Sequence, residues 1–170
     1  MLKIMNLKKQ KQKLIEDHIK SGSNVLSEEV LTKELLPFLE NTAKLLTLET
    51  AYFWADPDQD KFATLLLQNL QNHEETKRTI YFFASEQDAK RHPHFDRNCH
   101  RVDKLPIMFA LFHLLTLSDE VDEAIFYNQK GRMKELKGLN LADFIRQFQN
   151  YCQSVGITQP VAKTAPFGLA

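Results

Sequence analysis

The side chains best suited to chemistry lie close together, in a stretch that we call the histidine loop (residues 92–100). His92 and His94 are two residues apart, so both imidazoles would point the same way from an extended segment. Asp96, Cys99 and His100 could complete a shell of nitrogen, oxygen and sulfur ligands of the kind that binds zinc. Zinc sites usually draw their ligand pairs from separate parts of the chain, and no second pair with suitable spacing occurs. We therefore expect a polar surface loop, with these five residues as the only candidate metal ligands.

No other part of the chain carries a recognisable catalytic arrangement. His113 lies between Phe112 and Leu114, so we expect a core or partly buried histidine whose ring is satisfied by the backbone. A catalytic histidine would need an acid or a nucleophile within hydrogen-bond reach. The two cysteines, Cys99 and Cys152, fit no catalytic or metal motif, and no Gly-x-Ser-x-Gly motif is present. These residues favour a protein that is not an enzyme and has no cofactor.

Two groups of charged residues are candidates for binding. The arginine group consists of Arg91, Arg97 and Arg101, around the histidine loop. Guanidinium groups pair well with carboxylates across an interface, and they could also meet phosphate. The acidic corner lies further along the chain, at Asp119, Glu120, Asp122 and Glu123. It lacks the alternating oxygen ligands and the central glycine of a calcium loop, so it is either a solvated corner or a surface for a basic partner.

The net charge of zero hides a basic N-terminus. Residues 1–22 hold six lysines and two acids, so the rest of the chain is net acidic. This segment is either a helix docked by its Leu and Ile side chains, a helix that binds a partner, or an electrostatic arm. Membrane binding would need bulky aromatic residues opposite the lysines, and the segment has none. Docking or protein binding is favoured, and nucleic acid is a second candidate partner for the lysines.

Nothing in the sequence suggests secretion or a membrane span. The basic start is followed by further polar residues and not by the apolar region of a signal peptide. The longest apolar stretch, residues 105–117, is interrupted by Pro106 and His113, and it falls short of the ~20 residues that a spanning helix needs. We therefore expect a cytoplasmic protein.

A buried strand is the strongest structural feature of the sequence. The run from Thr79 to Ala84 is apolar, aromatic and β-branched, with no polar alternation, which is typical of a strand covered on both faces. Ser85 and Asp88 follow at once with the spacing of a helix cap, which predicts a short helix to Arg91. The chain is therefore expected to be α+β. An all-α bundle is the alternative, because short apolar runs distinguish strand from helix poorly.

Other local signals predict the remaining elements. Asp56, Pro57 and Gln59 have the pattern of a helix start, and Pro37 is expected to kink or break the helix before it. Asn128 and Gly131 suggest a hairpin turn, since both residues tolerate positive φ. In chain order, we expect helices over 2–20, 28–54, 57–70, 86–91, 104–117 and 139–152, and strands over 79–84, near 101–102, 123–128 and 132–136.

These elements give a three-part organisation. Residues 1–22 would be a basic helical extension, residues 23–156 a single α+β domain, and residues 157–170 an irregular tail. In the domain, a small mixed sheet would be packed with helices.

Four features form a recognisable order: Asp56-Pro57 before a helix, the run from Ile80 to Glu86, the Leu-rich helix 105–117, and an apolar segment that runs from Val121 to Gly131. Over residues 56–153 this order resembles the N-terminal domain of the SseB family, the bacterial "enhanced serine sensitivity" proteins. The aromatic strand and the basic N-terminus depart from that family. The resemblance implies an α+β module without an established active site.

The sequence thus predicts a bacterial-type interaction module rather than a catalyst. An accessory, adaptor or immunity-like protein fits a neutral chain without catalytic motifs, and its partner would be another protein. The arginine group and the acidic corner are the predicted contact surfaces. The alternative is an accessory factor of a mobile element or defence system that associates with nucleic acid through its N-terminal lysines.

Overall fold

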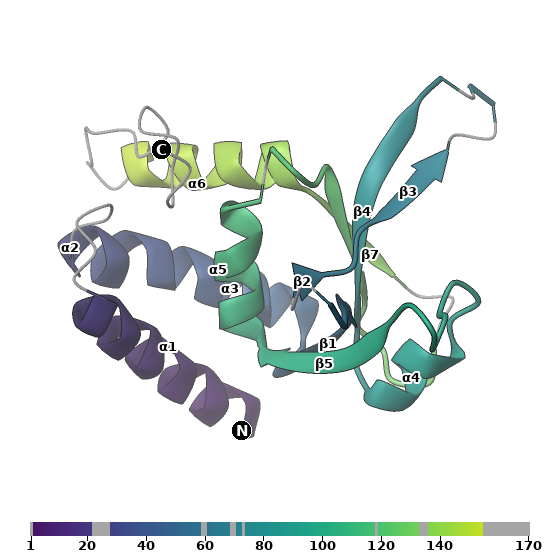
Figure 1. Ribbon diagram of the computed structural model, residues 1–170. Helices are drawn as coiled ribbons and strands as arrows, with labels where there is room; N and C mark the ends of the chain where they lie inside the picture. The colour runs from purple at the N-terminus through teal and green to yellow at the C-terminus, as the bar shows by residue number, and fades with distance from the viewer. Residues whose placement is uncertain are drawn as a thin grey trace. The chain divides into compact units, whose positions relative to one another are not determined.

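The computed structural model describes residues 2–21, 28–58, 61–68, 71–72, 74–117, 119–132 and 136–154. The chain is α+β, as the sequence predicts, and it divides into two compact units (Figure 1). The helical unit consists of Met1–Glu49, Pro106–Leu117 and Ala142–Ala170, and the sheet unit consists of Thr50–Leu105 and Ser118–Leu141. None of the described helices combines the length and the apolar character that crossing a membrane requires.

The helical unit is built around apolar side chains from segments far apart in sequence. Its elements are α1 (Leu2–Ser21), α2 (Glu28–Val30), the π-helical turn η1 (Leu31–Leu35), α3 (Leu36–Leu46), α5 (Ile107–Leu115) and nearly all of α6 (Leu141–Ser154). Helix α5 contacts both α1 and α3. Phe38 of α3 packs against Phe144 and Phe148 of α6, with ring centroids 5.3 Å apart in both pairs. The segment predicted as an N-terminal extension, α1, is thus part of this compact unit.

Pro37 does not break its helix, which was one of the two predicted effects. It lies in the first turn of α3, directly after η1, and the backbone stays helical from Glu28 to Leu46. The Leu36 N–H bonds to the carbonyl of Leu31, five residues earlier. The irregular turn and the proline therefore coincide, and both are common places for a continuous helix to depart from regular α geometry.

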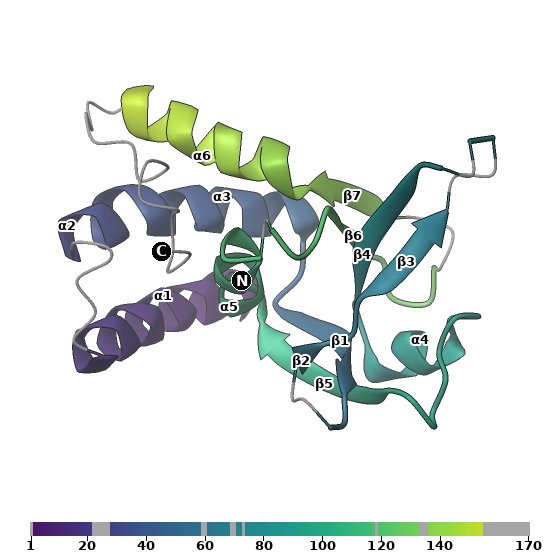
Figure 2. The same ribbon diagram turned by 45° about the horizontal axis from the view of Figure 1, so that its top comes forward.

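The sheet unit has a mixed sheet with β4 at its centre (Figure 2). The path of paired strands is β2-β1-β4-β6-β7; in addition, β3 pairs with β4 and β5 pairs with β1. Strand β4 is parallel to β6 and antiparallel to β1 and β3. The elements are β1 (Thr50–Asp56), β2 (Lys61–Phe62), β3 (Leu65–Gln68), β4 (Thr76–Phe83), α4 (Glu86–Arg91), β5 (Arg101–Pro106), β6 (Glu123–Tyr127) and β7 (Lys137–Asn140).

The predicted buried strand and its following helix are confirmed. Every residue of β4 from Thr79 to Phe83 is buried, because the strand has neighbours on both faces and both edges. On one face, Phe82 stacks on Phe126 of β6 at 4.8 Å. Ser85 caps α4, and its hydroxyl accepts a hydrogen bond from the Asp88 N–H at 3.1 Å.

Two predicted helices are wrong, and both errors fall in the same region. The helix expected to reach Trp54 ends at Leu46, where Thr47 turns into the left-handed region with φ +57°, and β1 follows. The helix expected over 57–70 is replaced by β2 and β3. Asp56 does not cap a helix: its carboxylate accepts the Asp58 N–H at 2.9 Å and closes a turn between β1 and β2.

The later elements are present with shifted boundaries. The strand expected near 101–102 continues to Pro106, so α5 begins at Ile107 and not at Lys104. The strand that pairs with β6 is Lys137–Asn140, not the predicted 132–136, of which residues 133–135 lie outside the described residues. Gly131 has the expected positive φ, +75°, whereas Asn128 does not, and the connection from β6 to β7 is longer than the predicted turn over 128–131. The predicted tail, 157–170, also lies outside the described residues.

Candidate functional site

His92, the first residue of the histidine loop, is buried and bonded through both ring nitrogens. Its Nδ1 lies 3.1 Å from the backbone nitrogen of His94 and accepts that N–H. The ring proton of the neutral imidazole is therefore on Nε2, which donates to the Tyr127 hydroxyl at 3.1 Å. His92 thus joins the loop after α4 to the end of β6.

This environment keeps His92 neutral. Burial, with a smaller contribution from the neighbouring His94, lowers the pKa of His92 to about 4. Burial also raises the pKa of the Tyr127 hydroxyl. Both groups therefore keep their protons in place around neutral pH, which suits a structural hydrogen bond better than proton transfer.

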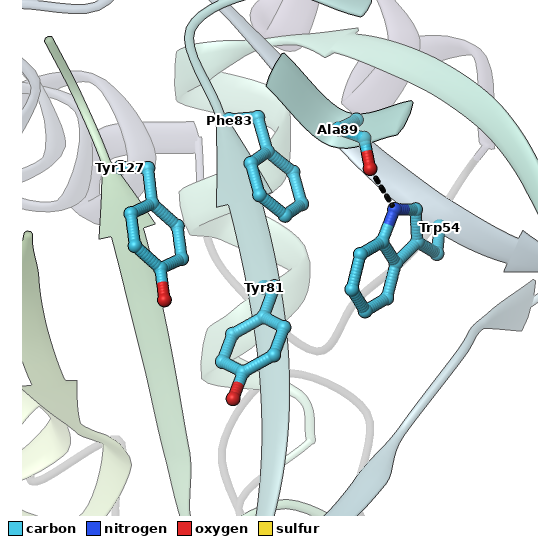
Figure 3. Close-up of a cluster of buried hydrophobic side chains, with 5 residues drawn as sticks. All are labelled: Trp54, Tyr81, Phe83, Ala89 and Tyr127. Atoms are coloured by element: carbon cyan, nitrogen blue, oxygen red, sulfur yellow. Dashed lines mark hydrogen bonds between the residues drawn. The ribbon is translucent and has the colours of Figure 1, made fainter. Parts of the chain in front are cut away.

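A cluster of buried, mostly aromatic side chains lies under the histidine loop, on one face of the sheet. Figure 3 shows this aromatic cluster, which consists of Trp54 of β1, Tyr81 and Phe83 of β4, Ala89 of α4 and Tyr127 of β6. The indole Nε1 of Trp54 donates to the Ala89 carbonyl at 3.0 Å, which ties α4 to the sheet (Figure 3). Phe83 and Tyr127 stack at 5.3 Å across the parallel strand pair.

The other two imidazoles of the loop lie over different members of this cluster. His100 stacks on Trp54 with centroids 5.0 Å apart and an angle of 5° between the planes. His94 is exposed and lies nearly parallel to Tyr81 at 6.1 Å. His92 and His94 therefore do not share an exposed face, as an extended segment would require. Their ring centroids are 5.1 Å apart and both rings pack near Tyr81, but the His92 ring is buried with both nitrogens bonded.

Asp96 and Cys99 bond to each other within the loop. The Asp96 carboxylate accepts the Asn98 N–H at 2.9 Å and lies 3.4 Å from the Cys99 thiol, which donates to it. These two bonds lower the pKa of Asp96, and the bond to Asp96 raises the pKa of the thiol, so Cys99 stays a thiol rather than a reactive thiolate. Across the described part of the chain, no three His, Cys, Asp or Glu side chains are grouped as a metal site would need.

The acidic corner is organised by an arginine that the sequence did not single out. Arg78 of β4 donates from Nη2 and Nε to the two carboxylate oxygens of Asp122, at 3.0 and 3.2 Å. Its Nη1 also donates to the Asp119 carbonyl at 2.7 Å, and its backbone N–H bonds to Asp122. The guanidinium lowers the pKa of Asp122. Asp122 therefore fixes the loop before β6, while Asp119 and Glu120 are exposed and Glu123 is half-buried.

The arginine group does not act as one unit. Arg101 of β5 pairs with Asp103 of the same strand, at 2.8 Å between Nη2 and Oδ2. Arg91, at the end of α4, and Arg97, in the histidine loop, are both exposed and form no ion pair with another described residue. These two guanidinium groups are therefore the ones available to a partner.

Half-exposed apolar side chains border the aromatic cluster. We call these side chains the apolar rim. The sequence did not reveal the part of the rim that comes from the region of β2 and β3, because that region was predicted to be helical. In the structure half-buried Leu65 and Leu67 alternate with exposed Leu66 and Gln68, but three consecutive leucines show no such alternation in the sequence, so no local signal could have revealed it. The members of the rim are Tyr52, Ala63, Leu65, Leu67, Phe95, Val102 and Ile125.

Two candidate regions lie in the helical unit. The side chain of His113 is exposed, so it is not a core residue, but the burial of part of the ring lowers its pKa. In α1, Leu7 and Leu14 are buried, which confirms that the helix docks by its apolar side, while Lys8, Lys9 and Lys13 face solvent. Cys152 lies in α6, and its side chain is outside the described part of the structure.

No family model, curated protein or solved structure matches this chain.

Proposed function

We propose that the chain is a non-enzymatic protein–protein interaction module whose partner binds on the sheet unit. The observation that carries the proposal is the surface around the aromatic cluster. There, the half-exposed apolar rim includes Phe95 of the histidine loop, and the same loop presents Arg97 without an ion pair to a described residue. Arg91 immediately precedes this loop.

This combination has the anatomy of a binding surface. Interfaces typically have an apolar centre, are enriched in aromatic residues and arginine, and concentrate their binding energy in a few such side chains. An unpaired arginine is also ready to form bidentate bonds with a carboxylate of the partner.

The histidine loop supports binding over catalysis. His92 is neutral, buried and bonded at both nitrogens, His100 is stacked on Trp54, and Cys99 is a hydrogen-bonded thiol. These side chains shape the loop and have no reacting position in common. The biological setting that we propose is a cytoplasmic adaptor or immunity-like protein of bacterial type, in line with the resemblance to the SseB family.

Affinity capture from cells that make the protein tests the proposal. The tagged wild type should retain a defined partner, and the double variant Arg91→Glu, Arg97→Glu should retain at least ~10-fold less of it, the effect of losing about 1.4 kcal/mol of binding energy. The matched control is Lys8→Glu, Lys9→Glu, which makes the same charge change on α1 and should retain the partner. Equal recovery by all three proteins, or no partner above an empty-bead control, would contradict the proposal.

The exposed lysines of α1 favour a second candidate function, association with nucleic acid. Lys8, Lys9 and Lys13 face solvent, but Glu16 and Asp17 are exposed on the same helix and reduce its positive potential. A gel shift with a single-stranded oligonucleotide at rising salt separates the two functions. Phosphate binding should weaken steeply with salt and disappear in the variant Lys8→Gln, Lys9→Gln, Lys13→Gln.

A further inference from the structure

Strand β3 lies at an edge of the sheet, beside β4 (Figures 1 and 2). Within the described sheet it pairs with β4 alone, in an antiparallel register that places Leu66 opposite Arg78. Arg78 turns both of its backbone groups away from β3: its N–H donates to the Asp122 carboxylate at 2.8 Å, and its carbonyl accepts the Asp122 N–H at 2.9 Å. Residues opposite each other in an antiparallel pair exchange either both backbone bonds or neither. The N–H and C=O of Leu66 therefore point to the outer side of β3, away from Arg78.

This outer side of β3 is open at Leu66. The residue is 67 % exposed, and no strand of the described sheet pairs with it on that side. An edge that presents unpaired N–H and C=O groups is a template for a further strand from another chain. The chemistry of the edge therefore favours an extended polypeptide as its ligand.

The other edge strands of the described sheet are protected against such pairing, and β3 is not. Charged residues and proline discourage the addition of a strand. Strand β5 contains three charged residues and ends at Pro106, and β2 and β7 each contain a lysine. Strand β3 has the sequence Leu-Leu-Leu-Gln, without a charge, a proline or a glycine. The edge of β3 is therefore the one suited to a partner.

The two faces of β3 differ, and this difference sets the side-chain pattern of an added strand. Leu65 and Leu67 are half-buried and pack against the aromatic cluster, whereas Leu66 points to the opposite face. A strand paired with β3 would place every second side chain on the face of the cluster, beside Leu65 and Leu67. Because these two leucines belong to the apolar rim, a partner that covers the rim also reaches this edge.

We propose that a segment of the partner protein binds as an added β-strand along the outer edge of β3, with an apolar side chain at every second position. This inference rests on the proposed function and names the conformation and the chemistry of the partner's segment. The partner residue opposite Leu66 exchanges backbone N–H and C=O bonds with it. The residues before and after that one turn their apolar side chains toward Leu65 and Leu67. In this binding mode the backbone bonds supply affinity, and the alternate side chains supply specificity.

Fluorescence anisotropy with the labelled peptide Glu-Thr-Val-Thr-Val-Thr-Glu tests this inference on the full chain. The valines would lie on the face of Leu65 and Leu67, so the threonine N–H groups face β3 and the valine N–H groups face solvent. The peptide should bind the wild type. N-methylation of its threonines should weaken binding at least ~10-fold, the effect of losing about 1.4 kcal/mol of backbone bonding. N-methylation of its valines is the matched control and should change the affinity by less than about 3-fold.

A matched pair of variants at Leu66 applies the same test to the protein. Leu66→Pro removes the outward N–H and leaves the bonds between β3 and β4 in place, because Leu66 forms none of them, and edge strands tolerate proline in this orientation. It should bind the peptide at least ~10-fold more weakly. Leu66→Thr keeps the N–H and a strand-forming side chain, so it should bind like the wild type. The fluorescence of Trp54, the only tryptophan, reports whether each variant is folded.

Four results would overturn the inference: no binding of the peptide by the wild type, equal weakening by the two sets of N-methyl groups, equal binding by the wild type and folded Leu66→Pro, or a wild-type dimer that Leu66→Pro separates, which would assign the edge to a second copy. If Leu66→Pro does not fold, the two methylated peptides decide with the wild type alone. If folded Leu66→Pro still captures the partner from cells as the wild type does, the inference fails and the proposed function stands. A wild type that captures no partner from cells removes the proposed function.

Discussion

His92 connects three parts of the sheet unit through one imidazole ring. It follows α4 directly, accepts a hydrogen bond from the loop and donates one to the last residue of β6. A protonated ring could not accept the His94 N–H, because its Nδ1 would itself carry a proton. The neutral state of His92 is therefore part of the folded structure, and its protonation must be linked to unfolding.

We expect the free energy of unfolding to fall as the pH falls from 6.5 to about 4. The folded-state pKa of His92 is about 4, below the ordinary value of 6.5, so the unfolded chain binds the proton more readily within this window. Above pH 6.5 the contribution is complete, and it amounts to about 3 kcal/mol at most. Urea unfolding followed by Trp54 fluorescence at several pH values measures it.

The matched variants for this prediction are His92→Gln and His94→Gln. The first keeps a donor for Tyr127 but cannot titrate, so its stability should depend less on pH over that window. The second changes an exposed ring and should keep the slope of the wild type. If the free energy of unfolding of His92→Gln falls with pH as steeply as that of the wild type, the acid sensitivity comes from other groups.

Gly131 is a second residue with a defined conformational role. Its φ of +75° is disfavoured for residues with a Cβ, and its N–H bonds to Asp88. We expect Gly131→Ala to lower the free energy of unfolding by about 1 kcal/mol through backbone strain alone, because a Cβ there would meet no atom within 4 Å. Gly131→Asn should cost less, since Asn tolerates this region. Equal losses in the two variants, measured by urea unfolding, would show that strain is not the cause.

At the scale of elements, the sequence predicts correctly the helices and strands whose local signals agree with their tertiary contacts. The apolar run of β4 ends at a serine cap, so strand composition and helix start point to the same boundary. The segment after Asp56 has no such agreement of signals. An Asp-Pro pair starts either a helix or a turn, and a short apolar run is compatible with the periodicity of a helix and with that of a strand. In that segment the strand conformation is determined by the pairing of β3 with β4, in which Leu65 lies opposite Thr79.

The candidate site was predictable only in part for a related reason. The histidine loop and both charged groups were visible as local clusters of residue types. The bonds from His92 to Tyr127 and from Arg78 to Asp122 join residues 35 and 44 positions apart. They exist because β4 and β6 pair in parallel in the observed register, Phe83 with Tyr127 and Thr79 with Glu123. No local pattern specifies that register, so the roles of the same residues could not be inferred.

Gln10 of α1 shows how one polar side chain orients a docked helix. It is 4 % exposed; its Nε2 donates to the Glu49 carbonyl at 3.0 Å, and its Oε1 accepts the Met108 N–H at 2.9 Å. The Met108 N–H lies in the first turn of α5, where backbone donors lack a partner within the helix. Gln10 thus connects α1 both to the start of α5 and to the residue before β1.

We expect Gln10→Ala to lower the free energy of unfolding by about 1–2 kcal/mol, because it leaves the buried Met108 N–H without its partner. The Glu49 carbonyl loses one of two bonds and keeps the one from the Ile107 N–H at 3.0 Å. Gln12→Ala, on the exposed side of the same helix, should change stability by less than about 0.5 kcal/mol. Urea unfolding followed by circular dichroism at 222 nm compares the two. Similar small effects in the two variants would mean that water satisfies the Met108 N–H when Gln10 is replaced.

At the scale of the whole molecule, neither unit is a continuous piece of chain. The helical unit takes residues from both ends and from the middle, and the sheet unit is interrupted by α5. A buried helix is therefore inserted in the sequence of the sheet unit, while its packing partners α1 and α3 come from the first part of the chain. This connectivity predicts that the sheet unit cannot be isolated as a simple fragment.

We expect a fragment of residues 50–141 to associate or to fail to fold. It retains α5 but lacks α1 and α3, so the apolar side chains that α5 buries in the full chain lose those neighbours: Ile107, Met108, Ala110, Leu111, Leu114 and Leu115. Exposing a large apolar side chain costs about 1.5–3 kcal/mol, so the sum for α5 approaches the 5–15 kcal/mol that stabilises a typical domain. Size-exclusion chromatography should show aggregates, and the same fragment with Leu111→Gln and Leu114→Gln should associate less. A monomeric unmodified fragment with the Trp54 emission of the full chain would show that the sheet unit folds without α1 and α3.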